Sequence, residues 1–291
     1  STAETIAMTG AMPIWCDIDE KTFCIDPELI EAKITSKTKA ILPVSLYGLM
    51  PNYTILESIA KKHNLFLIED GAQSFGASQI SSDNSEYKSC SCKHTDIATT
   101  SFFPTKPLGC YGDGGAIFVK NTELAKKIRA IKSHGGLERF KHKYIGLNSR
   151  LDTIQASILL VKMKYLDDVI ERRNRCANYN IERLSKVSGL ILPKKLPNCK
   201  HVWAQFSILA ETKEIRDKIV EKLKNAGVNV AIFYPSPLYS QECFSYTLQS
   251  NNFVLFNNLK ITENVCNRIF NLPCYGELTI NELNYIINIL L

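Results

Sequence analysis

One lysine of this chain has surroundings that are unusual for a lysine. Lys106 lies within residues 101–115, Ser-Phe-Phe-Pro-Thr-Lys-Pro-Leu-Gly-Cys-Tyr-Gly-Asp-Gly-Gly, a stretch that is otherwise apolar and rich in turn-forming residues. A desolvated lysine has a lowered pKa and can form a Schiff base with a carbonyl compound. The simpler alternative is a surface lysine between two proline turns. The glycines after Lys106 favour a functional site, because they allow unusual backbone angles or a close approach to a ligand.

A carboxylate and an amide follow a nearby apolar run. Asp70 comes directly after Leu65–Glu69, and Gln73 lies three residues further on. In open α/β sheets, ligands bind beyond the carboxyl ends of the strands. A carboxylate placed there can keep a ring nitrogen protonated, which pyridoxal phosphate requires. Asp70 could instead cap a following helix, but its combination with Lys106 favours the cofactor.

Two hydroxyl side chains, Ser101 and Thr105, flank Lys106. Either can bind a phosphate group, and either could equally satisfy backbone groups in a local turn. A lysine, a carboxylate and hydroxyls form one coherent set of residues for holding pyridoxal phosphate.

Composition excludes several other classes of protein. The chain has 291 residues, of which 45% are hydrophobic, so it can bury a large core. The formal charge of +6 is modest and scattered, and we expect neither nucleic-acid binding nor a membrane span. Cys90, Cys92 and His94 lack a second ligand pair at zinc-finger spacing, so no metal site is expected. Ten dispersed cysteines fit reduced thiols in a cytoplasmic protein.

Strand and helix patterns alternate along the chain, which predicts an α/β fold with a mainly parallel central sheet and helices on both faces. Strands are expected at residues 12–18, 39–45, 65–69, 95–103, 115–119, 201–209 and 228–234. Helices are expected at residues 1–8, 27–34, 55–63, 123–133, 151–170, 174–185, 214–226, 262–270 and 279–291. We predict a large α/β domain over residues 1–165 and a smaller α+β domain over residues 166–291.

Three stretches of the chain resemble one enzyme family. Residues 69–77 (Glu-Asp-Gly-Ala-Gln-Ser-Phe-Gly-Ala), 101–115 and 146–152 (Gly-Leu-Asn-Ser-Arg-Leu-Asp) are similar to the sugar aminotransferases of the DegT/DnrJ/EryC1/StrS type. The resemblance runs from Ser1 to Pro273. It implies the fold type I architecture of pyridoxal-phosphate enzymes and the amination of keto sugars carried on a nucleotide.

The same resemblance implies a role for individual residues. Lys106 would bind the cofactor covalently and then move the proton during amino transfer. Asp70 would pair with the pyridine nitrogen, Gln73 would bond the phenolic oxygen, and Ser101 would bind the phosphate. Asn148 would reach the phosphate of the neighbouring subunit's cofactor, so the resemblance implies a homodimer.

Three residues are expected to contact the substrate. Arg150 would lie near the sugar nucleotide across the same interface, although an ion pair within the chain is an equal alternative. Thr105 and Tyr234 complete the predicted substrate contacts. L-glutamate is the amino donor that the resemblance implies.

Short sequence motifs, such as residues 43–48 (Pro-Val-Ser-Leu-Tyr-Gly), suggest which class of sugar the protein acts on. These are most similar to enzymes acting on 3-oxo sugars derived from UDP-N-acetylglucosamine, including its uronate. The chain has Phe233-Tyr234-Pro235 where the family usually has His-Tyr-Pro, and Tyr239 where a second histidine is common. Phe233 could pack against the protein instead, so the uronate form stays open.

Two rival interpretations remain. The first is an aminotransferase for 4-keto-6-deoxyhexoses linked to dTDP, GDP or UDP. The second follows from the amino-terminal phosphate loop and ring-stacking aromatic that the family carries before the position of Ser1. Because these are expected to be missing, the chain would be either a fragment or a degraded copy that acts as a cofactor-free binding partner.

Overall fold

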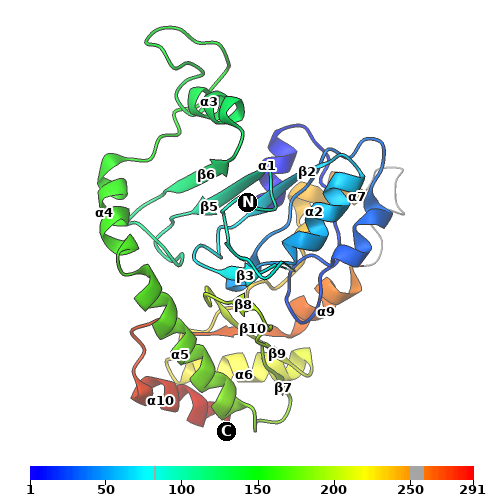
Figure 1. Cartoon of the computed structure of the whole chain (residues 1–291). Helices are drawn as coiled ribbons and strands as arrows, with labels where there is room; N and C mark the ends of the chain where they lie inside the picture. Colours follow the sequence, from blue (N-terminus) through cyan, green and yellow to red (C-terminus); the bar gives the residue numbers. More distant parts are fainter. Residues whose placement is uncertain (82, 249–258) are drawn as a thin grey trace.

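The computed structural model describes residues 1–81, 83–248 and 259–291 (Figure 1). Its largest sheet has the order β1-β2-β5-β6, with β1 (Ala40–Ile41), β2 (Phe66–Asp70), β5 (Ile97–Ser101) and β6 (Gly115–Val119). The first three strands are parallel, and β6 is antiparallel to β5. This mixed, mostly parallel sheet confirms the predicted α/β fold.

The register of this sheet brings the ends of β2 and β5 to one edge. Asp70 pairs with Thr99, two residues before β5 ends at Ser101. On the other side, the Asp70 N–H donates to the Pro43 carbonyl at 3.0 Å, and the Asp70 carbonyl accepts from the Ser45 N–H at 2.9 Å. Both sides of the Asp70 backbone are therefore held where parallel strands end.

A second sheet, of antiparallel strands, forms the lower part of the molecule in Figure 1. It has the order β10-β9-β7, with β10 (Ile269–Leu272), β9 (Phe206–Ala210) and β7 (Leu190–Ile191). All five residues of β9 are buried. The apolar sides of α5 (Leu166–Leu184), α6 (Lys213–Asn225) and α10 (Ile280–Leu290) complete this core. A small third sheet joins β4 (Glu86–Lys88), β3 (Ser78–Ile80) and β8 (Cys199–Lys200).

The other helices of the described ranges are short. They are α1 (Thr2–Met8), α2 (Tyr53–Lys62), α3 (Thr122–Ile131), α4 (Thr153–Met163), α7 (Ser245–Leu248) and α9 (Lys260–Arg268), with 3₁₀ turns η1 (Pro27–Leu29), η2 (Glu31–Lys33), η3 (Leu46–Gly48), η4 (Leu238–Ser240) and η5 (Glu242–Phe244). Among the helices of the described residues, none has both the length and the apolar content that a membrane crossing needs.

Four of the predicted elements were wrong. Residues 12–18 and 228–234 form isolated bridges in place of extended strands. Ile18 pairs with Ile25, and Ala231 pairs with Asn271 of β10 at a single position. The expected helix at 27–34 is two 3₁₀ turns.

The long helix predicted at residues 151–170 is broken. α4 ends at Met163, and α5 starts at Leu166. The break separates two surfaces of different character. Ile154 and Leu160 of α4 are 73% and 66% exposed, whereas α5 packs into the protein cores. Since Ile170 of α5 joins the core of the first sheet and Leu184 joins that of the second, the predicted domain division at residues 165 and 166 stays a prediction.

A buried carboxylate joins the beginning of the chain to α9. Asp17 is 4% exposed. Its Oδ1 accepts hydrogen bonds from the Thr262 N–H at 2.8 Å and the Thr262 hydroxyl at 2.6 Å, and its Oδ2 accepts from the Ile261 N–H at 2.9 Å. The N–H groups at the start of a helix have no partners within the helix. Asp17 therefore acts as a helix cap supplied from a distant part of the chain.

Replacing Asp17 by alanine should lower the free energy of unfolding by about 3 kcal/mol, because charge-assisted bonds are lost and buried N–H groups are left unpaired. Urea denaturation followed by circular dichroism measures the change. Glu221→Ala, on the exposed side of α6, is the control and should change the value by about 0.5 kcal/mol or less. Equal effects of the two substitutions would contradict the capping role.

Candidate active site

Lys106 lies in a compact turn beyond the end of β5. Its side chain is half-buried, and its N–H donates to the Phe103 carbonyl at 2.9 Å. Gly109 makes this turn possible, because a Cβ there would lie only 2.5 Å from the Pro104 carbonyl oxygen. Burial lowers the pKa of the Lys106 amine, and the Asp70 carboxylate acts in the opposite direction. The amine and this carboxylate are therefore close enough to interact electrostatically.

Asp70 is the last residue of β2 and is half-buried. Its Oδ1 accepts from the Ala72 N–H at 3.1 Å, and its Oδ2 accepts from the Thr2 hydroxyl at 2.6 Å. The first bond is a local turn contact, and a turn followed by β3 comes after Asp70, so the alternative of a helix cap is wrong. The second was missed, since Thr2 was considered only as part of a helix start. A residue near the start of the chain thus reaches the predicted site.

The carboxamide of Gln73 has a defined orientation. Its Oε1 accepts from the Tyr47 N–H at 2.6 Å. Because the oxygen is used in this bond, the amide NH₂ group is left to donate to a ligand. Tyr47 was not singled out in the sequence. Its backbone φ of 57° is uncommon for a residue other than glycine, but that angle is not visible in the sequence.

The two hydroxyl residues differ in their surroundings. Ser101 is half-buried at the end of β5, and its Oγ accepts from the Phe103 N–H at 3.2 Å. This bond matches the local turn role that was considered as the alternative. Thr105 is exposed on the turn that carries Lys106. Both residues flank Lys106 in the sequence. Their contacts with a ligand remain predictions.

Asn148 and Arg150 are exposed and bond to each other. The Arg150 Nε and Nη2 donate to the Asn148 Oδ1 at 3.1 and 2.9 Å. An amide oxygen, not a carboxylate, is therefore the partner of Arg150 in this structure. The two residues lie at the end of the long loop that follows α3 (residues 133–149), which Figure 1 shows at the top of the molecule. No described contact brings them to Lys106 within this chain.

Arg150 borders a broad hollow of about 1130 Å³. The hollow lies over β5, β6 and α3, and cationic side chains line it together with the apolar face of β6. The cationic residues are Lys120, Arg129, Lys132 and Arg150. Lys106 and Asp70 are not among the lining residues, so the hollow and the predicted site are different places.

Tyr234 lies near Tyr47, the residue whose N–H bonds to Gln73. It is 48% exposed, and it is close enough to Tyr47 to raise the pKa of that buried phenol, although burial is the larger cause. Phe233 packs in an apolar cluster with Phe23, Val265 and Tyr47. The residue in the place of the family histidine therefore has a packing role.

Replacing Asp70 by asparagine should lower the pKa of Lys106 further, because the opposing influence of the Asp70 carboxylate on the amine is removed. A neutral amine reacts with acetic anhydride, so the pH at which Lys106 is half-modified in a short pulse should fall. Mass spectrometry of the Lys106 peptide measures this midpoint. The control is Asp113→Asn, an exposed carboxylate in the glycine-rich turn. An unchanged or higher midpoint in the Asp70 variant would contradict their proximity.

Known proteins resemble this chain along its length. It is 46% identical over 243 residues to the UDP-2-acetamido-2-deoxy-3-oxo-D-glucuronate aminotransferase of Pseudomonas aeruginosa, an alignment that covers 83% of this chain and 64% of that protein. It is 35% identical over 278 residues to the UDP-N-acetyl-3-dehydro-alpha-D-glucosamine 3-aminotransferase of Acidithiobacillus ferrooxidans, covering 96% of this chain and 70% of that protein. The chain therefore spans roughly two thirds of the length of these relatives.

A solved structure supports the fold and the cofactor class. NtdA of Bacillus subtilis, crystallised with its bound cofactor PMP, superimposes with a TM-score of 0.87 at 32% identity, covering 99% of this chain and 63% of that one. The model of the DegT/DnrJ/EryC1/StrS aminotransferase family matches residues 1–291. The predicted family, fold and pyridoxal phosphate dependence are thus confirmed. The chain belongs to the DegT/DnrJ/EryC1/StrS aminotransferase family of pyridoxal-phosphate-dependent enzymes.

Proposed function

We propose that this protein transfers an amino group from L-glutamate to the keto group of a UDP-linked 2-acetamido-3-oxo sugar or its uronate. The observation that carries the proposal is the electrostatic interaction of Lys106 with Asp70 at the end of β2, with Gln73 in the turn directly after that strand. The names of the relatives from P. aeruginosa and A. ferrooxidans support the choice of sugar and the position of the keto group.

The residues at the ends of β2 and β5 and in the turn of Lys106 fit pyridoxal phosphate. Asp70 offers a carboxylate at the end of β2 to a protonated ring nitrogen. Gln73 presents its NH₂ group, as the phenolic oxygen requires, because Tyr47 occupies the amide oxygen. Ser101 lies at the end of the neighbouring strand, where its hydroxyl can bind the phosphate. Lys106 would hold the cofactor covalently.

The chemistry depends on the protonation of Lys106. Pyridoxal phosphate, when bound, supplies the carbonyl and the electron-withdrawing ring that carry the amino group from donor to acceptor. Only a neutral lysine amine can act as nucleophile or accept a proton, and burial lowers the pKa of Lys106 in that direction. Asp70 has the complementary task of keeping the ring nitrogen protonated.

Thr105 and Tyr234 are proposed to contact the sugar nucleotide. Thr105 is exposed beside Lys106, and Tyr234 is half exposed beside Tyr47, which itself bonds Gln73. Both side chains can donate a hydrogen bond to a sugar hydroxyl or a phosphate.

A homodimer is proposed from the exposed apolar surface of the excursion at residues 133–149 and of α4. Phe140 and Ile145 are 82% and 101% exposed, and Leu147 is 65% exposed. Exposed apolar side chains concentrated in one segment are a mark of an interaction site. In such a dimer, Asn148 and Arg150 would contact the cofactor and the sugar nucleotide of the neighbouring subunit.

The cytoplasm is the proposed location. All ten cysteines are free thiols, and nine of the ten are buried or half-buried without forming a disulfide. Reduced thiols are typical of reducing compartments. No disulfide-dependent stabilisation is therefore expected for this protein.

The covalent role of Lys106 is tested with the full chain, pyridoxal phosphate and borohydride. Reduction should attach a phosphopyridoxyl group to the peptide that contains Lys106, and the Lys106→Ala variant should lose both this label and all amination of UDP-2-acetamido-3-oxo-glucose. Lys186→Ala, an exposed lysine after α5, serves as the control and should retain both. Labelling that survives in the Lys106 variant would refute the proposal, and preferential amination of dTDP-4-keto-6-deoxyglucose would refute the choice of substrate.

The dimer is tested by placing a charge on the exposed excursion. Ile145→Asp should shift the sedimentation of the protein from dimer toward monomer and reduce cofactor retention, because a buried carboxylate without a partner is costly. Leu291→Asp makes the same change at an exposed position at the end of the chain and should leave the dimer intact. A wild-type protein that sediments as a monomer would exclude the dimer.

A further inference from the structure

We propose that Tyr47 is a positioning residue, whose hydroxyl holds the loop of Tyr234 at a set place relative to the Gln73 amide and thereby sets the affinity for the sugar substrate. The inference rests on the function proposed above, in which Gln73 contacts the cofactor and Tyr234 contacts the sugar nucleotide. It adds to that function a residue that touches neither ligand.

Tyr47 uses each of its polar groups on a different segment of the chain. Its N–H donates to the Gln73 Oε1 at 2.6 Å, in the turn after β2. Its carbonyl accepts from the Gln205 N–H at 3.3 Å, next to β9. Its hydroxyl donates to the Phe233 carbonyl at 2.5 Å. One residue therefore connects the central sheet, the second sheet and the loop that carries Tyr234.

The backbone at Tyr47 is held in an unfavourable conformation. Its φ of 57° lies in the left-handed region, which costs free energy for an aromatic residue. Gly48 follows with a φ of 103°, and a Cβ there would lie 2.8 Å from the Trp203 nitrogen. Such strain persists where the surrounding contacts determine it, and it is concentrated at functional sites. Here it directs the N–H toward Gln73 while the ring lies toward Phe233.

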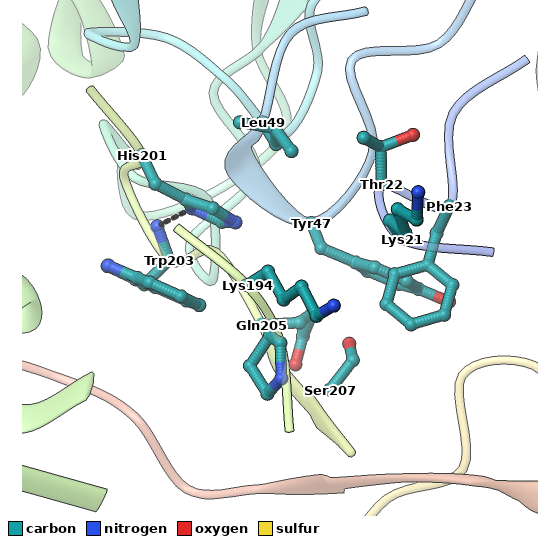
Figure 2. Close-up of a pocket in the computed structure, with 11 residues that line it drawn as sticks. Lys21, Thr22, Phe23, Tyr47, Leu49, Lys194, His201, Trp203, Gln205 and Ser207 are labelled. Atoms are coloured by element: carbon teal, nitrogen blue, oxygen red, sulfur yellow. Dashed lines mark hydrogen bonds between the residues drawn. The ribbon is translucent and has the colours of Figure 1, made fainter. Parts of the chain in front are cut away.

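The ring of Tyr47 is fixed by packing. It is 5% exposed and meets Phe23 edge to face, with ring centroids 5.5 Å apart. Figure 2 shows the two rings side by side, near Lys21 and Thr22 on one side and near Gln205 and Ser207 on the other. The hollow they border has room of about 10 Å³, no more than one water molecule. The hydroxyl consequently has little freedom to leave the Phe233 carbonyl.

The protonation of the phenol supports the same role. Burial raises the pKa of Tyr47, so the hydroxyl stays protonated and can donate. The carbonyl that receives the bond belongs to the residue directly before Tyr234. Since the Phe233 N–H is also bonded, to the Asn271 Oδ1 at 2.9 Å, both polar groups of its backbone are tied. The backbone directly before Tyr234 is therefore held at both its N–H and its carbonyl group.

The test is Tyr47→Phe, which keeps the ring and the backbone bond to Gln73 and removes only the hydroxyl. In the full chain, the KM for the UDP-sugar should rise about fivefold, while kcat and the retention of pyridoxal phosphate should stay within about twofold. Hydrogen–deuterium exchange without substrate should become about fivefold faster at the amides of residues 233, 234 and 236 only.

Tyr179→Phe is the matched control, because it removes another partly buried hydroxyl, which donates to the Asn284 Oδ1 at 2.6 Å in the second sheet's core. It should change neither KM nor the exchange at residues 233–236. An unchanged KM in the active Tyr47 variant, or a lower kcat and cofactor retention at constant KM, would overturn the proposal. If the wild type shows no aminotransferase activity, the proposed function fails, and the exchange measurement alone decides whether Tyr47 positions the loop.

Discussion

The site depends on the backbone of Asp70 being held from both sides. Its N–H and carbonyl bond to Pro43 and Ser45, and the next N–H, that of Gly71, donates to the Thr99 carbonyl at 2.8 Å. Two parallel neighbours thereby determine where β2 ends. Because side chains of a strand alternate between faces, this also determines that the Asp70 carboxylate leaves the sheet toward the turn of Lys106.

Ending β2 at Asp70 leaves the carboxylate of the preceding residue, Glu69, buried in the protein. Glu69 is 2% exposed, and burial raises its pKa. Its carboxylate accepts from the Ser89 hydroxyl at 2.6 Å and the Cys90 N–H at 3.0 Å, so the buried group is satisfied by hydrogen bonds instead of a cation. Two adjacent acidic residues thus serve opposite faces of one strand. Glu69 binds residues 89 and 90 through its hydrogen bonds. Asp70 remains available to a ligand.

Sequence patterns predicted the parts of the molecule that depend on local chemistry. The apolar run before Asp70 and the glycine-rich turn after Lys106 were recognised, because burial on both faces and tight turns leave composition signals. The strand expected at residues 12–18 was wrong, since a strand exists only where a neighbour pairs with it. Thr2 and Tyr47 could not be found from the sequence, because their bonds to Asp70 and Gln73 join segments far apart in the chain.

The cap that Asp17 supplies to α9 has a consequence for biosynthesis. More than 240 residues separate the carboxylate from the N–H groups that it bonds. During translation, the first of these partners is made long after the strands of the central sheet, so Asp17 must remain hydrated while that sheet folds. The cap therefore forms late, and it couples the packing of the segment before β1 to the packing of α9.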